Sequence, residues 1–299
     1  MKILLATKAS SKTGIGHLVR SLLISSLLTE NDIENAVYIE QDGSLDIRYL
    51  LKEQTIINGD LEKLNNITKN NFDKIIFDSY EKREILNEIS SEKILISDSE
   101  NDIDYKIDGI LDFNFENKNL YKNSSLCNLI GAEYFPISET SHPEFIFNDE
   151  QPRNIENILI SVGGVSNSSL FDYNLLLNFI KNSPSAKFFV ADPQNKLSSF
   201  FSTVNLVKQS SLSKILKENN IDLVINSGGL SKQILFHNRI NMLFVKRTAW
   251  EINSIKYFTE NIGGDYFDEF KNLDEYLPNL KIYNNVQLKT EKLIDYIKG

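Results

Sequence analysis

The chain has 299 residues, a formal net charge of −9 and a pI near 5.0, with 41% hydrophobic and 24% charged residues. This composition is ordinary for a globular protein of one large or two average domains, and its acidic balance argues against an extended nucleic-acid-binding surface. Cys127 is the single cysteine, which excludes an intramolecular disulfide and a metal site built from several cysteines. The apolar runs are too short for a signal-peptide core or a membrane span, so we expect a cytoplasmic protein without stable membrane insertion.

The first half of the sequence alternates between short apolar runs and helix-like segments. Strands are predicted at 2–7, 36–41, 55–58, 74–78, 93–98 and 108–113, and helices at 17–30, 44–53, 60–69 and 81–91. Strands separated by helices of this length indicate βαβ units in a parallel sheet.

Residues 132–156 interrupt this alternation with three of the six prolines, which indicates a crossing between domains. The alternation then restarts, with strands predicted at 158–162, 186–191, 204–208, 222–226 and 241–245 and helices at 168–182, 211–219, 229–238, 249–261 and 285–298. We therefore predict two facing, doubly wound, Rossmann-like α/β domains, 1–140 and 155–299, joined by a crossing at 141–154. Ligands of such folds bind beyond the carboxyl ends of the strands, so we expect the active site in the interdomain cleft.

The turn after the first predicted strand carries Gly14, Gly16 and His17. Glycines let the backbone approach a ligand, a helix start suits phosphate, and histidine readily exchanges a proton near neutral pH. The same residues also fit a tight turn with no ligand. A dinucleotide fingerprint is broken because Val19 occupies the place of its third glycine, although Glu40 would imitate the ribose-binding acid of such a site.

Further polar residues and glycines follow other predicted strands, where a doubly wound fold places its ligand. Each has a structural explanation as well, because acidic residues after strands often cap helices and Gly-Gly turns commonly join strands to helices. The set comprises Asp78, Tyr80, Asp98, Gly163, Gly164, Ser227, Gly228 and Gly229.

The segment Gly14-Ile15-Gly16-His17-Leu18-Val19-Arg20 resembles the Gly-x-Gly-His-x-x-Arg signature of the nucleotide-sugar hydrolase family of pseudaminic acid biosynthesis, which cleaves UDP-2,4-diacetamido-2,4,6-trideoxy-β-L-altropyranose. The resemblance continues through Asp78 and Tyr80 and covers residues 1–245 in order. It implies the GT-B fold. It also implies that His17 is the general base, that Tyr80 lies near the sugar, and that Gln233 stands where the family has a ribose-binding glutamate.

Through this resemblance we expect hydrolysis of a UDP-linked amino or deoxy sugar at its anomeric carbon, without metal or other cofactor. The reaction would release UDP and the free sugar in nonulosonic, pseudaminic-type acid or surface polysaccharide biosynthesis. Two alternatives stay open: a GT-B glycosyltransferase that uses a nucleotide-sugar donor, and a non-catalytic nucleotide-sugar-binding protein. The expected catalytic residues are His17, Tyr80 and Asp78, and the expected binding residues are Gly14, Gly16, Arg20, Asp98, Gly163, Gly164, Ser227, Gly228, Gly229 and Gln233.

Overall fold

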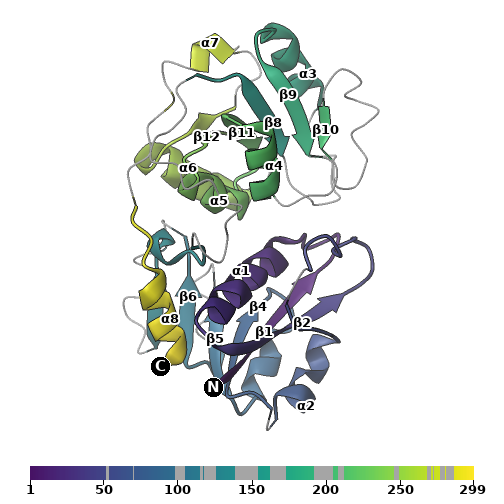
Figure 1. The fold of residues 1–299 in the computed structure, drawn as a ribbon, viewed down its shortest axis with the longest axis vertical. Coiled ribbons are helices and arrows are strands. Elements are labelled where there is room, and N and C mark those ends of the chain that lie inside the picture. The colour runs from purple at the N-terminus through teal and green to yellow at the C-terminus, as the bar shows by residue number, and fades with distance from the viewer. Residues whose placement is uncertain are drawn as a thin grey trace. The chain divides into compact units, whose positions relative to one another are not determined.

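The computed structural model describes residues 1–51, 54–69, 71–97, 105–114, 117, 126–138, 154–161, 173–191, 205–207, 212–245, 249–267, 271, 273–276, 280 and 286–299. The chain divides into two compact units. Unit 1 comprises Met1–Pro143 and Val286–Gly299, and unit 2 comprises Glu144–Asn285. Figure 1 shows the elements of each unit.

Unit 1 contains a seven-stranded sheet with the order β3-β2-β1-β4-β5-β6-β7, and its paired strands all run parallel. The strands are β1 (Lys2–Ala9), β2 (Glu34–Gln41), β3 (Ile56–Asn58), β4 (Lys74–Asp78), β5 (Glu92–Ile96), β6 (Gly109–Asp112) and β7 (Cys127–Ile130). The α-helices are α1 (Gly16–Glu30), α2 (Leu64–Thr68) and α8 (Thr290–Lys298), and short 3-10 helices lie at Leu61–Lys63, Arg83–Asn87 and Ala132–Tyr134.

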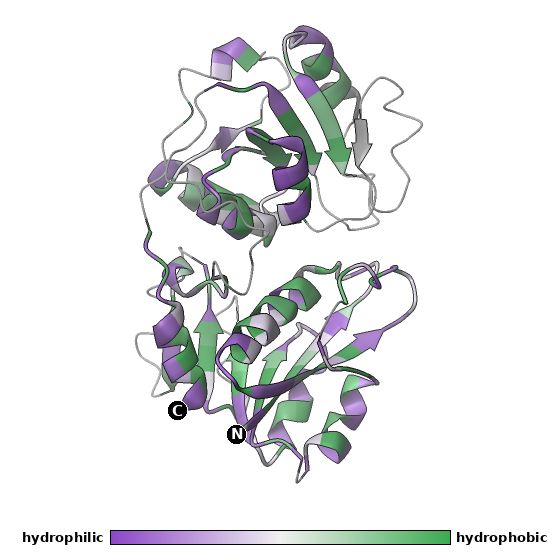
Figure 2. Ribbon diagram, in the orientation of Figure 1, coloured by the Kyte–Doolittle hydropathy of each residue, from purple (hydrophilic) through white to green (hydrophobic). Residues whose placement is uncertain are grey.

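The inner strands of unit 1 are hydrophobic on both faces, which is typical of a parallel sheet. All five residues of β4 are buried, and the strands are largely hydrophobic in Figure 2. Side chains of the sheet such as Leu4, Ile75 and Leu95 form a buried core together with Leu64 and Leu86 from outside the strands. This core fixes the sheet, and with it the loops at the carboxyl ends of β1 and β4.

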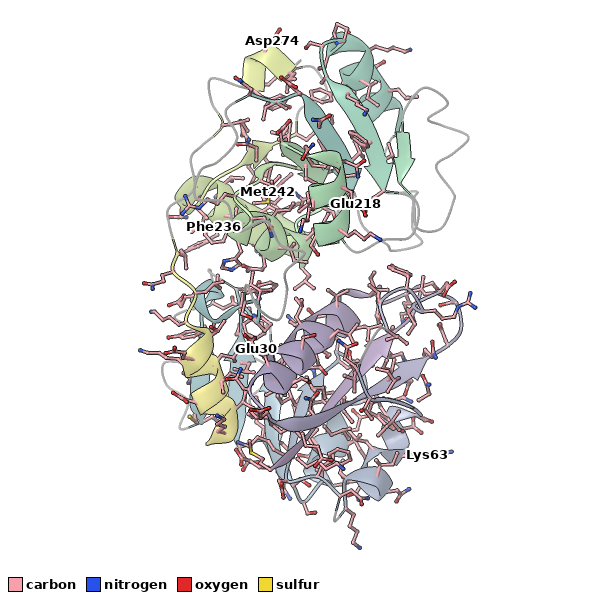
Figure 3. The ribbon with its side chains drawn as sticks, in the orientation of Figure 1. Glu30, Lys63, Glu218, Phe236, Met242 and Asp274 are labelled. Carbon is pink, nitrogen blue, oxygen red and sulfur yellow. The ribbon has the colours of Figure 1, made fainter. Side chains whose placement is uncertain are left out.

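Unit 2 contains a six-stranded parallel sheet with the order β10-β9-β8-β11-β12-β13. Its strands are β8 (Asn157–Ser161), β9 (Lys187–Ala191), β10 (Asn205–Val207), β11 (Leu223–Asn226), β12 (Asn241–Phe244) and β13 (Asp265–Tyr266). Its helices are α3 (Tyr173–Asn182), α4 (Leu212–Asn219), α5 (Ser231–His237), α6 (Ala249–Asn261) and α7 (Leu273–Tyr276). Met242 on β12 is fully buried in the interior of this unit (Figure 3). Across the described parts of both units, no helix is long and apolar enough to cross a membrane.

Each sheet has a point at which the direction of winding reverses. In unit 1, β1 lies between β2 and β4, and in unit 2, β8 lies between β9 and β11. Loops on either side of such a point lead away in opposite directions, which leaves a crevice that open α/β sheets use for ligands. In unit 1 this point brings together the end of β4 and the β1–α1 loop.

The C-terminal segment differs from the predicted domain division. We predicted that 155–299 belongs to the second domain, whereas residues 286–299 belong to unit 1. The hydroxyl of Tyr296 lies 3.0 Å from the Ile110 carbonyl oxygen and 2.9 Å from that of Cys127. Lys74 Nζ donates to the Ile297 carbonyl at 2.6 Å, and the apolar side of α8 is buried. Residues 141–153 of the predicted crossing lie outside the described residues.

Two predicted helices are wrong, and the local backbone contacts and conformation explain why. The predicted helix at 44–53 is absent from its described part, 44–51. There the Asp46 carboxylate accepts the Arg48 backbone N–H at 3.1 Å, which competes with helical hydrogen bonding. The predicted helix at 81–91 contains only the 3-10 helix at Arg83–Asn87, which follows Lys82 in a left-handed conformation with φ of 60°.

Candidate functional site

His17 lies in the first turn of α1, directly after the β1–α1 loop. The Gly14 backbone N–H donates to the Ser10 carbonyl at 2.7 Å and closes this loop. Gly14 has a φ of 79°, a conformation that favours glycine, so its presence has a backbone reason whatever it binds. Gly16 is the first residue of α1. The loop therefore places His17 at the carboxyl end of β1, beside the point where the sheet reverses.

Asp78 binds both His17 and Arg20. His17 and Arg20 are three residues apart on α1 and so share a helix face, while Asp78 ends β4 and pairs with Thr7 of β1. Asp78 Oδ1 lies 2.6 Å from His17 Nδ1. The Arg20 guanidinium holds both carboxylate oxygens, from Nε at 2.8 Å and from a terminal nitrogen at 2.6 Å. Three predicted site residues thus form one contact group.

The charge of Asp78 determines which ring nitrogen of a neutral His17 carries the proton. Asp78 is fully buried, and burial alone raises a carboxyl pKa, but the charge of Arg20, the interaction with His17 and the hydrogen bonds outweigh it and lower the pKa of Asp78 to about 2. An ionised carboxylate only accepts hydrogen bonds, so Nδ1 of a neutral His17 carries the proton and donates it to Asp78. Nε2 then keeps its lone pair and is free to act as a base.

Tyr80 packs against the histidine of this group. The rings of Tyr80 and His17 meet edge to face, with centroids 4.5 Å apart and planes at 82°. The Tyr80 side chain is 52% exposed. The Arg83 guanidinium lies 5.3 Å from the Tyr80 ring centroid. Sequence reasoning missed Arg83, because no motif distinguishes it from any other charged residue that follows a strand.

Glu40 has a structural role in place of the ribose-binding role considered from the sequence. Its carboxylate pairs with Lys8 Nζ at 2.8 Å and Lys82 Nζ at 3.0 Å, and accepts the Leu61 backbone N–H at 2.8 Å. These contacts tie the carboxyl ends of β1 and β2 to the turn after β4.

The turn between β11 and α5 holds a second group of predicted residues. Asn226 Oδ1 accepts the Gly228 backbone N–H at 2.8 Å, and the buried amide nitrogen of Asn226 has no hydrogen-bond partner among the described residues. Gly228 has a φ of 80°, and an added Cβ would lie 2.7 Å from Ile255, so glycine is required there for structural reasons. An added Cβ at Gly229 would meet no atom of the described residues within 4 Å. Ser227, in the same turn, is buried.

The remaining predicted residues are less informative. Gln233 lies on α5 and is only 2% exposed, so a ribose contact would require movement of the residues that cover it. Asp98, Gly163 and Gly164 lie outside the described residues. Among the side chains that are described, no group of three or more His, Cys, Asp or Glu is arranged to hold a metal ion.

Solved structures share the fold of the whole chain at low sequence identity. Arabidopsis thaliana UGT89C1, complexed with UDP-L-rhamnose, aligns with a TM-score of 0.64 at 11% identity over 99% of this chain and 93% of its own. The glycosyltransferase SnogD from Streptomyces nogalater aligns with a TM-score of 0.58 at 11% identity, covering 100% and 95%. A putative UDP-N-acetylglucosamine 2-epimerase from Listeria monocytogenes aligns with a TM-score of 0.58 at 11% identity, covering 100% and 96%.

These alignments establish the fold class. No protein-family model matches the sequence, and no curated protein matches it significantly. The likeness in structure nevertheless covers essentially the full chain, and each unit has a doubly wound parallel sheet. The chain therefore has the GT-B fold, as predicted.

Proposed function

We propose that the chain acts on a nucleotide sugar and that His17 is the base for attack at the anomeric carbon. One observation carries this proposal: the 2.6 Å contact between His17 Nδ1 and the buried Asp78 carboxylate. Because that contact holds the proton on Nδ1, Nε2 is left to accept a proton from an attacking oxygen. A base in this position contributes a rate factor of about 10²–10⁴.

The proposed reaction moves one proton and exchanges one bond. The attacking oxygen forms a bond to the anomeric carbon, while the bond from that carbon to the diphosphate oxygen breaks and its electron pair leaves with the nucleoside diphosphate. The proton of the nucleophile passes to His17 Nε2. Asp78 stabilises the resulting imidazolium, and Arg20 keeps Asp78 ionised and in position.

Glycosyl transfer to a hydroxyl acceptor is the first candidate for this reaction. Solved structures of this fold include an enzyme named as a glycosyltransferase and a protein complexed with a UDP-sugar. They favour the alternative of transfer over the hydrolysis that the sequence motif suggested. Two features of the described residues, the lack of any atom near a Cβ added at Gly229 and the buried amide of Asn226, support the expectation that the nucleotide binds at the β11–α5 turn.

Hydrolysis is the second candidate, and the signature residues support it. Arg20 and Tyr80, both part of the resemblance to the pseudaminic-type hydrolases, each contact the His17–Asp78 pair. Under this candidate, water takes the place of the hydroxyl acceptor, and the substrate is a UDP-linked amino or deoxy sugar.

A labelling experiment separates these candidates. The protein is incubated with UDP-sugars in ¹⁸O-enriched water containing a chelator, with and without N-acetylhexosamine and aryl glycoside acceptors. Hydrolysis predicts UDP release without acceptor and ¹⁸O in the free sugar, whereas transfer predicts release only with an acceptor. Binding without release under either condition would support the non-catalytic alternative, and ¹⁸O in UDP would contradict attack at the anomeric carbon.

A matched pair of histidine variants tests the assignment of the base. His17→Asn should lower release by about 10²–10⁴, while His237→Asn, on α5 of unit 2, should keep it. Equal activities of the two variants would contradict the role of His17.

A further inference from the structure

The turn Ser79–Arg83, which carries Tyr80, is held by contacts along its length. The Glu81 backbone N–H donates to Ser79 Oγ at 3.1 Å, and Arg83 Nε donates to the Ser79 carbonyl at 2.7 Å. Lys82 lies 2.6 Å from Asp60 through its ammonium, in addition to its pairing with Glu40. The backbone on both sides of Tyr80 is therefore fixed, although Tyr80 itself is half exposed.

The Tyr80 ring has two close neighbours, the His17 ring and the Arg83 guanidinium. His17 forms the edge-to-face contact, and the Arg83 guanidinium lies over the ring. Arg83 is buried, so its charge is shielded from water and its attraction to the ring is stronger than at an exposed site. The chain of contacts runs from Arg83 through Tyr80 to His17 and Asp78.

We propose that Arg83 is a positioning residue that holds the Tyr80 ring against His17. This inference rests on the proposed function, which makes His17 the base, and on the family resemblance, which implies that Tyr80 lies near the sugar. Arginine suits this role because its Nε donates to the Ser79 carbonyl while the planar guanidinium lies over the ring. Lysine keeps the charge but lacks the Nε donor and the flat surface.

Kinetics of Arg83→Met and Arg83→Lys, with Arg48→Met as the matched control, test the inference. Arg48 is a highly exposed arginine whose side chain, among the described residues, pairs only with the nearby Asp46. We expect kcat/KM to fall about tenfold in Arg83→Met, given the usual strength of a shielded cation–π contact. Arg83→Lys should lose nearly as much, and Arg48→Met should lose nothing. Full activity in both Arg83 variants, folded as judged by circular dichroism, would overturn the inference.

A double-mutant cycle distinguishes positioning of Tyr80 from a general structural role. If Arg83 acts through the ring, replacing it in a Tyr80→Ala background should change kcat/KM less than about twofold. A structural role predicts the same fold-loss in both backgrounds, and that result would contradict the proposal.

An NMR measurement tests the geometry independently of any activity, so that failure of the proposed function and failure of this inference are distinguishable. The chain has three histidines, and the imidazole signals of His17 are assigned by their loss in His17→Asn. Ring currents from Tyr80 shift those signals, so Arg83→Met should move them while Arg48→Met leaves them in place. Unchanged His17 signals in Arg83→Met would refute the positioning role even in a protein that proves to release UDP.

Discussion

Replacement of Asp78 by asparagine tests the electrostatic basis of the site. The Asp78→Asn side chain has nearly the same shape but cannot carry the charge that holds Arg20. The pKa of Asp78 falls from 3.8 to about 2 in the folded protein, and each unit corresponds to about 1.4 kcal/mol. The ionised carboxylate therefore contributes about 2 kcal/mol to the free energy of unfolding at neutral pH.

The pH dependence has a definite sign. Because folding lowers this pKa, the contribution is complete well above pH 3.8 and is lost as the pH falls through about 2. With a urea slope of about 2 kcal/mol per molar, Asp78→Asn should lower the midpoint at pH 7 by about 1 M. At pH 2 the wild type and the variant should be much closer.

Urea unfolding followed by far-UV circular dichroism at pH 7, 4 and 2 measures this difference. Trp250, the only tryptophan, lies in α6 of unit 2, so its fluorescence provides an internal reference outside the unit that contains Asp78. The same displacement at all three pH values would refute the reasoning, because the loss would then come from shape and not from charge. No displacement at pH 7 would refute it as well.

Three further predictions follow from the geometry. His17→Ala should lower turnover by about 10²–10⁴ while nucleotide-sugar affinity, measured by calorimetry, stays within about tenfold; full turnover would contradict the role of base. Gly109→Ala should destabilise the chain by about 1–3 kcal/mol in thermal melts, because the added Cβ would clash with the Tyr296 hydroxyl; in a Tyr296→Phe background this cost should shrink, and an equal cost would argue against the clash. UDP release should persist after dialysis against a chelator, and loss that only a divalent ion restores would show a metal requirement.

Much of the fold was predictable because the strands that matter most are buried on both faces. The predicted strand at 74–78 coincides with β4, and the predicted strand at 222–226 extends β11 by one residue. A short continuous apolar run is typical of a strand that is buried on both faces of a parallel sheet. The strand β7 was missed because it lies at the edge of its sheet with its residues only partly buried or exposed, and β13 because two residues carry too little pattern. The place of α8 was also missed, because an amphipathic helix shows that it packs but not which sheet it packs against.

The part of the candidate site that lies at the ends of neighbouring strands could be predicted from the sequence. His17 and Asp78 follow neighbouring strands of a sheet whose winding reverses between them, so their proximity follows from topology. The spacing of Arg20 from His17 predicts a shared helix face but not the shared carboxylate. Arg83 was not predictable, because its place over Tyr80 depends on a turn held by Lys82 in a left-handed conformation.

Because α8 belongs to unit 1, the folding of unit 1 cannot be completed until the C-terminal residues have been synthesised. Lys74 is made 223 residues before Ile297, whose carbonyl its buried ammonium binds, and all of unit 2 is synthesised between them. While the ribosome makes unit 2, the apolar surface that α8 covers and the Lys74 ammonium have no helix to meet them. Nascent unit 1 is therefore an incomplete folding intermediate with an uncovered patch, and this is the stage at which chaperone binding or misassembly would act on it.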